Sequence, residues 1–298
     1  RVQDPNNQIE HLRSGEADMM DDVPREVWEQ LEADPKITLE RHWALNICYL
    51  GLNVVHEKTS DVRLRRAIRL AIDPQQLGKL YYGTARPTYS LVAQPFAEYD
   101  PNYRAPGTGA PLEQRRRRAR ELLVEAGALG RSLKIYYPMD KRPYLPTPQK
   151  VADKLRQQLG QIDLHVDIVA VPNKELFESV RNNHYELILI GWMSDNADPD
   201  NFYMPLASGD PATGRPGPMN CGRVFDLEVH QALLHAQALA DPQQRIDAYR
   251  AVERRLQEHI VGYVPLLNTQ QGYAFGPRLW GVEIDPLGHY RFAGAELR

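Results

Sequence analysis

Cysteine, long apolar runs and an excess of one charge are all scarce in this sequence. Its 298 residues include only Cys48 and Cys221, with no Cys-x-x-Cys pair, so a disulfide scaffold is excluded and a zinc site is disfavoured. No apolar stretch approaches the roughly 20 residues that span a bilayer. The formal net charge is −3, from 36 basic and 39 acidic side chains, so no nucleic-acid partner is expected.

Local signatures of nucleotide or ester chemistry are missing as well. The sequence has no P-loop and no Gly-x-Ser-x-Gly elbow, and its nine histidines are scattered. What is present is an ordinary globular composition, 42% hydrophobic and 25% charged, whose length suits two domains or one large α/β domain. The chain begins at Arg1 with no Met and no signal peptide, and we therefore expect it to be part of a longer or processed protein.

Capping residues and apolar spacing predict mainly helices in the first 126 residues. Asp61 caps a predicted helix over 62–71, in which Leu64 and Ile68 mark the buried face. The other elements predicted here are a short helix beginning near Pro24, extended segments within 37–52, a helix over 74–81, a long ordered loop over 84–110 and a helix over 111–126.

Strands and helices then alternate in a way that is typical of a parallel sheet. Strands are expected at 133–137, 164–171 and 186–190, with helices at 147–159 and 174–181 between them. This β-α-β-α-β order implies right-handed crossovers and an α/β fold. After a Gly/Pro-rich loop over 207–222, two amphipathic helices, roughly 225–240 and 242–260, precede a strand over 263–268 and a hairpin-like tail.

Two loops leave the carboxyl ends of these strands, where ligands gather in open parallel sheets. The first carries Arg142 and Tyr144, and the second carries Trp192, Asp195 and two further aspartates. An arginine can donate two parallel hydrogen bonds to a carboxylate, and an aspartate can accept from an ammonium. If both loops line one cleft, the pair complements a zwitterion. Two extended residues span about 7 Å, so a dipeptide can bridge such groups.

Other interpretations of these residues stay open on spacing alone. Arg142 can be a surface residue, and the aspartates can be turn and helix caps. The run 195–200 lacks the glycine and glutamate of an EF-hand loop, which disfavours calcium. A hydrolase that uses Asp195, Asp198 and Asp200, with or without a divalent metal, is a further alternative. The arginine run 115–118 has no interleaved aromatics and is expected to be a solvated helix face.

The stretch from Leu187 to Phe202 resembles a signature of the family 5 extracellular solute-binding proteins, the dipeptide- and oligopeptide-binding components of ABC importers. Similar segments keep the family's order along the chain, at 61–68 with 71–73, 80–85, 244–249 and 285–292. The similarity is closest to dipeptide-binding members and to a relative linked with antimicrobial-peptide resistance. The resemblance implies a type II periplasmic-binding-protein architecture, with 1–52 as part of an N-terminal lobe, 53–267 as the C-terminal α/β ligand-binding lobe and 268–298 as a return segment to the N-terminal lobe.

The resemblance also implies roles for individual residues. Asp195 matches the carboxylate that receives the α-ammonium of a peptide, Arg142 and Tyr144 match a loop whose arginine receives the ligand carboxylate, and Trp192 would wall the pocket. We therefore expect a monomeric periplasmic binding protein without catalysis or cofactor. Its expected partners are a short peptide and the permease subunits of an ABC transporter. Another cargo, such as haem, a glutathione-like molecule or a metal chelate, is the alternative.

The sequence departs from the family pattern in two places. Cys221 matches one half of a disulfide of the dipeptide-binding members, whereas Gly209 stands near the other half, so this bridge is expected to be lost. The N-terminal lobe that precedes this segment in family members is missing from the chain. The family works by hinge closure of two lobes around the ligand, and we expect the chain to supply one complete lobe and part of the second.

Overall fold

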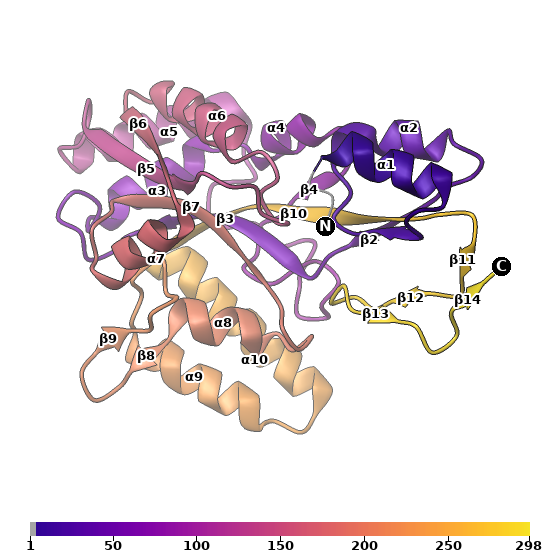
Figure 1. The fold of residues 1–298 in the computed structure, drawn as a ribbon. Coiled ribbons are helices and arrows are strands. Elements are labelled where there is room, and N and C mark those ends of the chain that lie inside the picture. Colours follow the sequence, from indigo (N-terminus) through magenta and orange to yellow (C-terminus); the bar gives the residue numbers. More distant parts are fainter. Residues whose placement is uncertain (1–3) are drawn as a thin grey trace.

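One eight-stranded mixed sheet organises the protein, as the computed structural model of residues 4–298 shows (Figure 1). Six strands lie in the order β1-β10-β3-β7-β5-β6, and β2 and β4 pair with β10 off that path. The strands of this sheet are β1 (Met19–Met20), β2 (Thr38–Trp43), β3 (Asn46–Leu52), β4 (Ala85–Pro87), β5 (Ser132–Pro138), β6 (His165–Val171), β7 (Leu187–Met193) and β10 (Tyr263–Phe275).

Helices lie on both sides of the sheet, and Figure 1 shows α5 and α6 on the opposite side from α8, α9 and α10. The α-helices are α1 (Pro5–Ser14), α2 (Trp28–Glu32), α3 (Val62–Ala71), α4 (Pro74–Gly78), α5 (Leu112–Glu125), α6 (Pro148–Gly160), α7 (Asn173–Arg181), α8 (Asp200–Ala207), α9 (Leu227–Ala238) and α10 (Pro242–Arg255). Shorter elements are the helical turns η1 (Arg25–Val27), η2 (Lys79–Tyr81) and η3 (Leu256–Ile260), and the paired strands β8 (Gly209–Asp210) with β9 (Arg215–Pro216), β11 (Leu279–Trp280) with β14 (Glu296–Leu297), and β12 (Glu283–Ile284) with β13 (Tyr290–Arg291).

The predicted parallel unit is confirmed, with one change at the end of its last strand. β5 pairs in parallel with β6 from Ser132 opposite His165, and with β7 from Ile135 opposite Leu187. β7 runs three residues further than expected because β3 pairs antiparallel along its whole length. Trp192, which the sequence placed in a loop, is therefore a strand residue opposite Ile47.

Several elements were not anticipated from the sequence, among them α1, α8 and β4. α1 has only two apolar side chains, Ile9 and Leu12, both buried on one face, and Asp4 caps it. α8 contains Pro205, which sequence rules place outside helices, and it is only eight residues long. β4 is a three-residue strand inside the segment expected to be a loop. In each case the contact with β10 or the core outweighs a weak local signal.

The long strand β10 crosses from a large hydrophobic core to a small one. Its first residues, such as Tyr263 and Leu267, belong to the large core around the parallel unit, to which β3 also belongs. Ala274, near its end, packs in the small core. The small core consists of Ile9, Leu12, Met20, Val23, Trp28, Leu31, Ile37 and Ala274. The lobe boundaries at residues 52 and 267 stay a prediction. No helix within residues 4–298 is long and apolar enough to cross a membrane.

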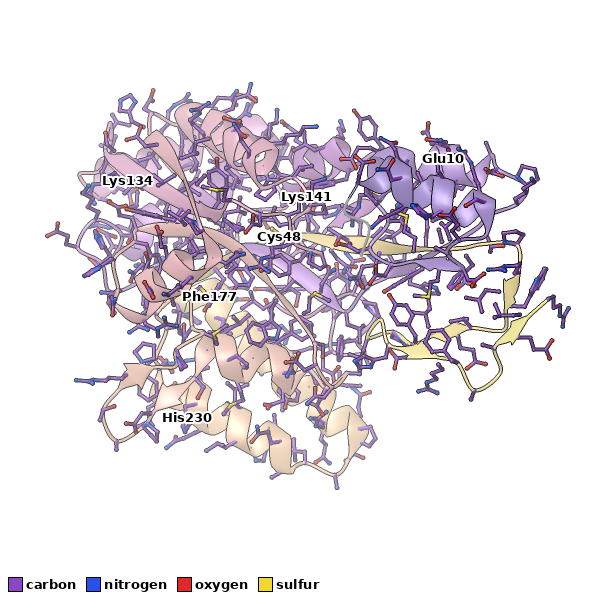
Figure 2. All side chains as sticks on the ribbon, viewed as in Figure 1. Glu10, Cys48, Lys134, Lys141, Phe177 and His230 are labelled. Atoms are coloured by element: carbon purple, nitrogen blue, oxygen red, sulfur yellow. The ribbon has the colours of Figure 1, made fainter. Side chains whose placement is uncertain are left out.

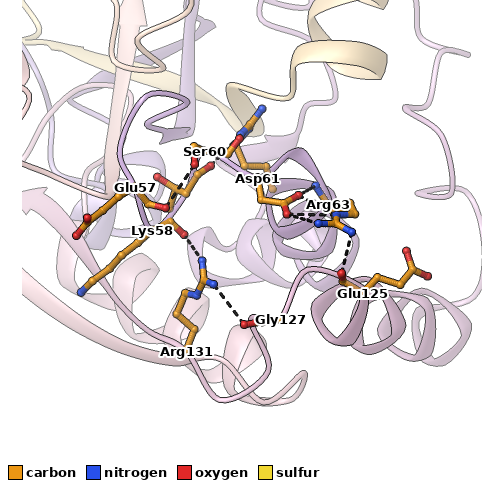
Figure 3. Close-up of polar contacts among 10 residues, drawn as sticks. Glu57, Lys58, Ser60, Asp61, Arg63, Glu125, Gly127 and Arg131 are labelled. Atoms are coloured by element: carbon orange, nitrogen blue, oxygen red, sulfur yellow. Dashed lines mark hydrogen bonds and ion pairs between the residues drawn. The ribbon is translucent and has the colours of Figure 1, made fainter.

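Arginines of α3 attach this helix to its neighbours. The Arg63 guanidinium donates to the capping carboxylate of Asp61 and to the Glu125 carbonyl at the end of α5, each at 2.7 Å (Figure 3). The buried Arg65 donates to the carbonyls of Ile260 and Val261, at 3.3 and 3.1 Å. These carbonyls at the end of η3 have no partner within the turn, so the guanidinium compensates both them and its own burial.

Candidate functional site

The turn after β5 is fixed by backbone pairing and by a contact with β10. Arg142 and Leu145 exchange backbone hydrogen bonds of 3.1 and 2.9 Å, which close a tight turn around Pro143 and Tyr144. The Thr269 hydroxyl on β10 donates to the Pro143 carbonyl at 2.7 Å. This turn holds the two residues expected to meet the ligand carboxylate.

Behind this turn, a buried polar network joins the strands that run between the two cores. Asn46 Nδ2 donates to Thr269 Oγ1 at 3.0 Å, and Thr269 N–H donates back to Asn46 Oδ1 at 3.0 Å. Asn268 Nδ2 donates to the Asn46 carbonyl at 2.8 Å. All three side chains are fully buried, so their mutual bonds satisfy polar groups that water cannot reach. The network therefore fixes the turn at Pro143 relative to both strands.

Tyr144 lies directly over the backbone of β7. A Cβ added to Gly191 would overlap the Tyr144 ring and the Ile47 carbonyl, so only glycine leaves room for the ring at this point of the strand. Tyr144 is buried, and burial raises the pKa of its phenol well above the usual range. The phenol therefore stays neutral and acts as a wall with one polar end.

Tyr144, Trp192 and Asp195 line one cavity of about 230 Å³. Three of the four residues singled out in the sequence are thus brought together. Aromatic and sulfur-bearing side chains complete the lining, namely Tyr49, Phe177, Met193, Met219 and Cys221. Phe177 reaches the cavity from α7, and Figure 2 shows it beside the end of the sheet. The cavity is an apolar, aromatic space with one carboxylate at its edge.

Asn201 in the first turn of α8 holds Trp192, near the end of β7, and Asp195, just after it. Its Oδ1 accepts from Trp192 Nε1 and from the Asp195 backbone N–H, both at 3.0 Å. The Ser194 N–H donates to the Leu45 carbonyl at 2.8 Å, which keeps the loop on β3. Sequence reasoning gave Asn201 no role. The signal available for it was an asparagine six residues after Asp195, at the start of a helix.

The Asp195 carboxylate is exposed and has no cationic partner within the described part of the chain. Its contact is a 3.4 Å hydrogen bond from Asn201 Nδ2. The other two aspartates of the loop are already engaged. Asp198 accepts from Arg245 at 2.8 and 2.9 Å, and Asp200 accepts from Tyr249 and Gln237 at 3.2 and 2.8 Å. Burial raises the pKa of Asp200 above its usual range.

The different partners of the three aspartates bear on the metal and hydrolase alternatives. Asp198 and Asp200 face α9 and α10, away from the cavity that Asp195 lines. Residues 4–298 contain no group of three or more His, Cys, Asp or Glu side chains placed to hold a metal ion. The three aspartates therefore do not converge on one reaction centre.

Arg142 does not share the cavity with Asp195. It is half-buried and lines a second cavity, of about 280 Å³, on the other side of the turn. The expectation of one cleft with both charges holds for Asp195, Tyr144 and Trp192 but not for Arg142 in this arrangement. The reason is the tight turn, which sends the side chains at 142 and 144 to different cavities.

The loop over 208–224 is held by hydrogen bonds. Cys48 and Cys221 are both free and buried, and burial raises the pKa of the Cys221 thiol to about 12. Asn220 Nδ2 donates to the carbonyls of Ser208 and Val224, at 3.1 and 2.6 Å. The Tyr263 hydroxyl donates to the Leu206 carbonyl at 2.6 Å. These bonds order the loop that brings Cys221 to the cavity.

The arginine run on α5 is locally neutralised, as expected for a solvated helix face. Arg116 pairs with Glu113, and Arg118 pairs with Glu121 and Glu125. The buried Arg115 donates to the Leu70 carbonyl at 3.0 Å. Ion pairs thus neutralise two of the four arginines, whereas Arg115 departs from the expected solvated face because it is buried, and Arg117 is exposed.

Comparison with known proteins places this geometry in a family. Residues 1–214 match the bacterial extracellular solute-binding proteins, family 5, in their middle region. The chain belongs to this family. The expectation drawn from the Leu187–Phe202 stretch and the type II periplasmic-binding-protein architecture are thereby confirmed.

The family members found include proteins named for peptide transport. The chain is 27% identical over 288 residues to the probable ABC transporter periplasmic-binding protein SapA of Escherichia coli. The match covers 96% of this chain and 51% of that protein. It is 26% identical to di/tripeptide-binding protein 2 of Pseudomonas aeruginosa, over 99% of this chain and 54% of that protein. HbpA2 of Haemophilus parasuis has the same fold, with a TM-score of 0.84, 26% identity and coverage of 100% of this chain and 57% of that one.

These relatives are solute-binding proteins and not enzymes, which leaves the hydrolase alternative without support. The chain spans about half the length of the curated relatives it matches.

Proposed function

We propose that this chain forms one side of the peptide-binding cleft of a periplasmic solute-binding protein, which delivers short peptides to the permease subunits of an ABC importer. The observation that carries the proposal is the cavity lined by Tyr144, Trp192 and Asp195, in which one carboxylate with no cationic partner among residues 4–298 meets an aromatic wall. The names of the relatives support a peptide as the cargo. A dipeptide is the proposed ligand.

In this proposal the two ends of the ligand are held by opposite charges. Asp195 accepts from the α-ammonium, and Arg142 donates to the ligand carboxylate across the Tyr144 turn. Trp192 and Tyr144 pack on the peptide between them. Asp195 and Arg142 both lie in the 53–267 lobe, and the residues 1–52 and 268–298 belong to the second lobe, which closes over the bound ligand. The buried network of Asn46, Asn268 and Thr269 lies where the strands cross between the cores, which suits a hinge of fixed direction.

Calorimetric titration of the whole protein with Ala-Ala and with N-acetyl-Ala-Ala tests the role of Asp195. The free ammonium is expected to improve the affinity by about tenfold or more, because a charge-assisted bond to a carboxylate is lost on acetylation. This difference should vanish in Asp195→Asn. In the same way, amidation of the ligand carboxylate should weaken binding to the wild type but not to Arg142→Gln.

Equal binding of Ala-Ala by the wild type and by a protein with both substitutions would exclude the assigned site. Titration with haem and with glutathione tests the alternative cargoes. The whole protein is expected to be a monomer by light scattering.

A further inference from the structure

The second cavity is lined by an unusual set of unpaired cations. It has a volume of about 280 Å³ and lies between residues 22–26, the segment 80–84 and the segment 141–150. Four cationic side chains line it: Arg25, Lys141, Arg142 and Lys150. The acidic side chains among its lining residues are Asp22 and Glu26.

None of these four cations forms an ion pair within the described part of the chain. This is not the general state of arginines in the protein. Arg245 pairs with Asp198, and Arg255 pairs with Asp226 and with Glu228. Four positive charges against two negative ones at a concave surface raise the local potential and favour an anionic ligand.

Arg25 gives the clearest sign of an unfilled bonding position. Its guanidinium donates to the Gln270 carbonyl and lies over the rings of Trp28 and Tyr81, at 5.6 and 5.9 Å. Its Nε is buried and has no hydrogen-bond partner among residues 4–298. A buried donor without a partner is costly, and a ligand oxygen in the cavity would satisfy it.

The cations exceed what one carboxylate requires. In the proposed function Arg142 receives the ligand's terminal carboxylate, which leaves three cations, Arg25, Lys141 and Lys150, beside the two acidic residues Asp22 and Glu26. The cavity also has space beyond a single carboxylate group. We infer that this cavity receives a second carboxylate of the ligand, so that the preferred cargo is a short peptide with an acidic side chain next to its carboxyl end. This inference rests on the proposed function and adds a substrate class to it.

The experiment compares peptides that differ only in that charge. Ala-Glu and Ala-Gln have nearly the same shape, and Ala-Ala provides the baseline for peptide binding. Titration of the whole protein at low ionic strength is expected to give about tenfold tighter binding of Ala-Glu than of Ala-Gln. The preference should shrink as salt is added, because part of the cavity is open to solvent.

Lys150→Gln is the informative variant, because Lys150 is exposed in the first turn of α6 and its loss should not impair folding. It is expected to reduce the Glu-over-Gln preference to about threefold while Ala-Ala binds as before. Lys134→Gln is the matched control. It removes the same charge from an exposed residue of β5, which Figure 2 shows well away from Lys141. It should leave the preference unchanged.

Three outcomes would overturn the inference. Equal affinities for Ala-Glu and Ala-Gln would exclude an acidic side chain in this cavity while leaving peptide binding intact. An unchanged preference in Lys150→Gln would place the preference elsewhere. Binding of inorganic phosphate with no discrimination between the two peptides would assign the cations to a free anion. Failure of all three dipeptides to bind would instead overturn the proposed function itself and this inference with it.

Discussion

The two cavities on either side of the 142–145 turn differ in charge and in what surrounds them. The cavity of Tyr144 and Trp192 has aromatic walls and one exposed carboxylate, Asp195. The cavity of Arg142 is polar and has four cations around it. Arg142 and Tyr144 are two positions apart in the sequence, yet their side chains line different cavities.

The comparison shows how a short turn can separate opposite charges. Direct contact of Asp195 with Arg142 would neutralise both and leave neither for a ligand. Because the two side chains line different cavities, each charge stays available. A zwitterionic ligand can then bind through interactions that the empty protein does not already make.

The largest effect on stability is expected from Gly191→Val, which changes the residue that the Tyr144 ring packs against. The new side chain would overlap the Tyr144 ring and the Ile47 carbonyl, so the turn must move or β3 and β7 must separate. We expect a loss on the order of 3 kcal/mol in the free energy of unfolding. Urea unfolding followed by circular dichroism measures it.

Gly160→Ala is the control for this substitution, because an added Cβ there meets open space at the end of α6. It should change the unfolding free energy by less than about 1 kcal/mol. An unchanged urea midpoint for Gly191→Val would show that Tyr144 does not depend on the glycine.

The second effect concerns the side with the aromatic walls. Asn201→Ala removes the acceptor shared by Trp192 Nε1 and the Asp195 N–H. The unfolding free energy should fall by about 1–2 kcal/mol, and peptide affinity should fall as well, because Trp192 and Asp195 lose their fixed positions. Trp fluorescence of the folded protein should shift at the same time.

Asn182→Ala provides the comparison, since Asn182 is exposed at the end of α7 and lies outside both cavities. It should leave peptide affinity and fluorescence unchanged. If Asn201→Ala binds Ala-Ala like the wild type, Asn201 has no positioning role.

The third prediction separates two aspartates of the same loop. Asp195→Asn should reduce the affinity for a free amino terminus by about tenfold and barely change stability, because its carboxylate is exposed and has no cationic partner. Asp198→Asn should lower the unfolding free energy by about 0.5–1 kcal/mol through the lost Arg245 pair, with a smaller effect on binding. Parallel calorimetry and urea unfolding give both quantities. The reverse pattern would assign the ligand to Asp198.

The smallest expected effect concerns the rate at which the Cys221 thiol is alkylated. Burial raises the pKa of this thiol to about 12, so almost none of it is thiolate at neutral pH. The rate of its alkylation should rise about tenfold per pH unit up to at least pH 10 instead of levelling off near pH 9. Because Cys221 lines the aromatic cavity, saturating peptide should slow the reaction. Mass spectrometry of the modified peptide measures it.

Cys48 is the internal reference, since it is buried in β3 outside both cavities. Its slow alkylation should not respond to peptide. A rate at Cys221 that levels off near pH 9, or that peptide does not change, would place the thiol outside the bound ligand's reach.

Some elements and site residues of this protein could be predicted from the sequence, and others could not. The parallel unit was predicted because its strands are short apolar runs and its helices have apolar spacing and clear ends, as at Gly160. α8 was missed because Pro205 argues against a helix that packing nevertheless stabilises. In the site, Tyr144, Trp192 and Asp195 could be chosen because the sequence placed them in loops after predicted parallel strands, although Trp192 lies within β7. The role of Gly191 could not be predicted, because it depends on the Tyr144 ring, which comes from the turn after β5.

The sequence by itself determined the local order of strands and helices, the caps such as Asp61, and the residue types available beyond the strand ends. These depend on neighbours within a few positions of the chain. Only the tertiary structure decided which aspartate stays without a cationic partner and which cavity Arg142 enters. Asp198 meets Arg245 across 47 positions, and Pro143 meets Thr269 across 126. Such contacts follow from the packing of whole elements, because a side chain's partner is set by where its helix or strand lies.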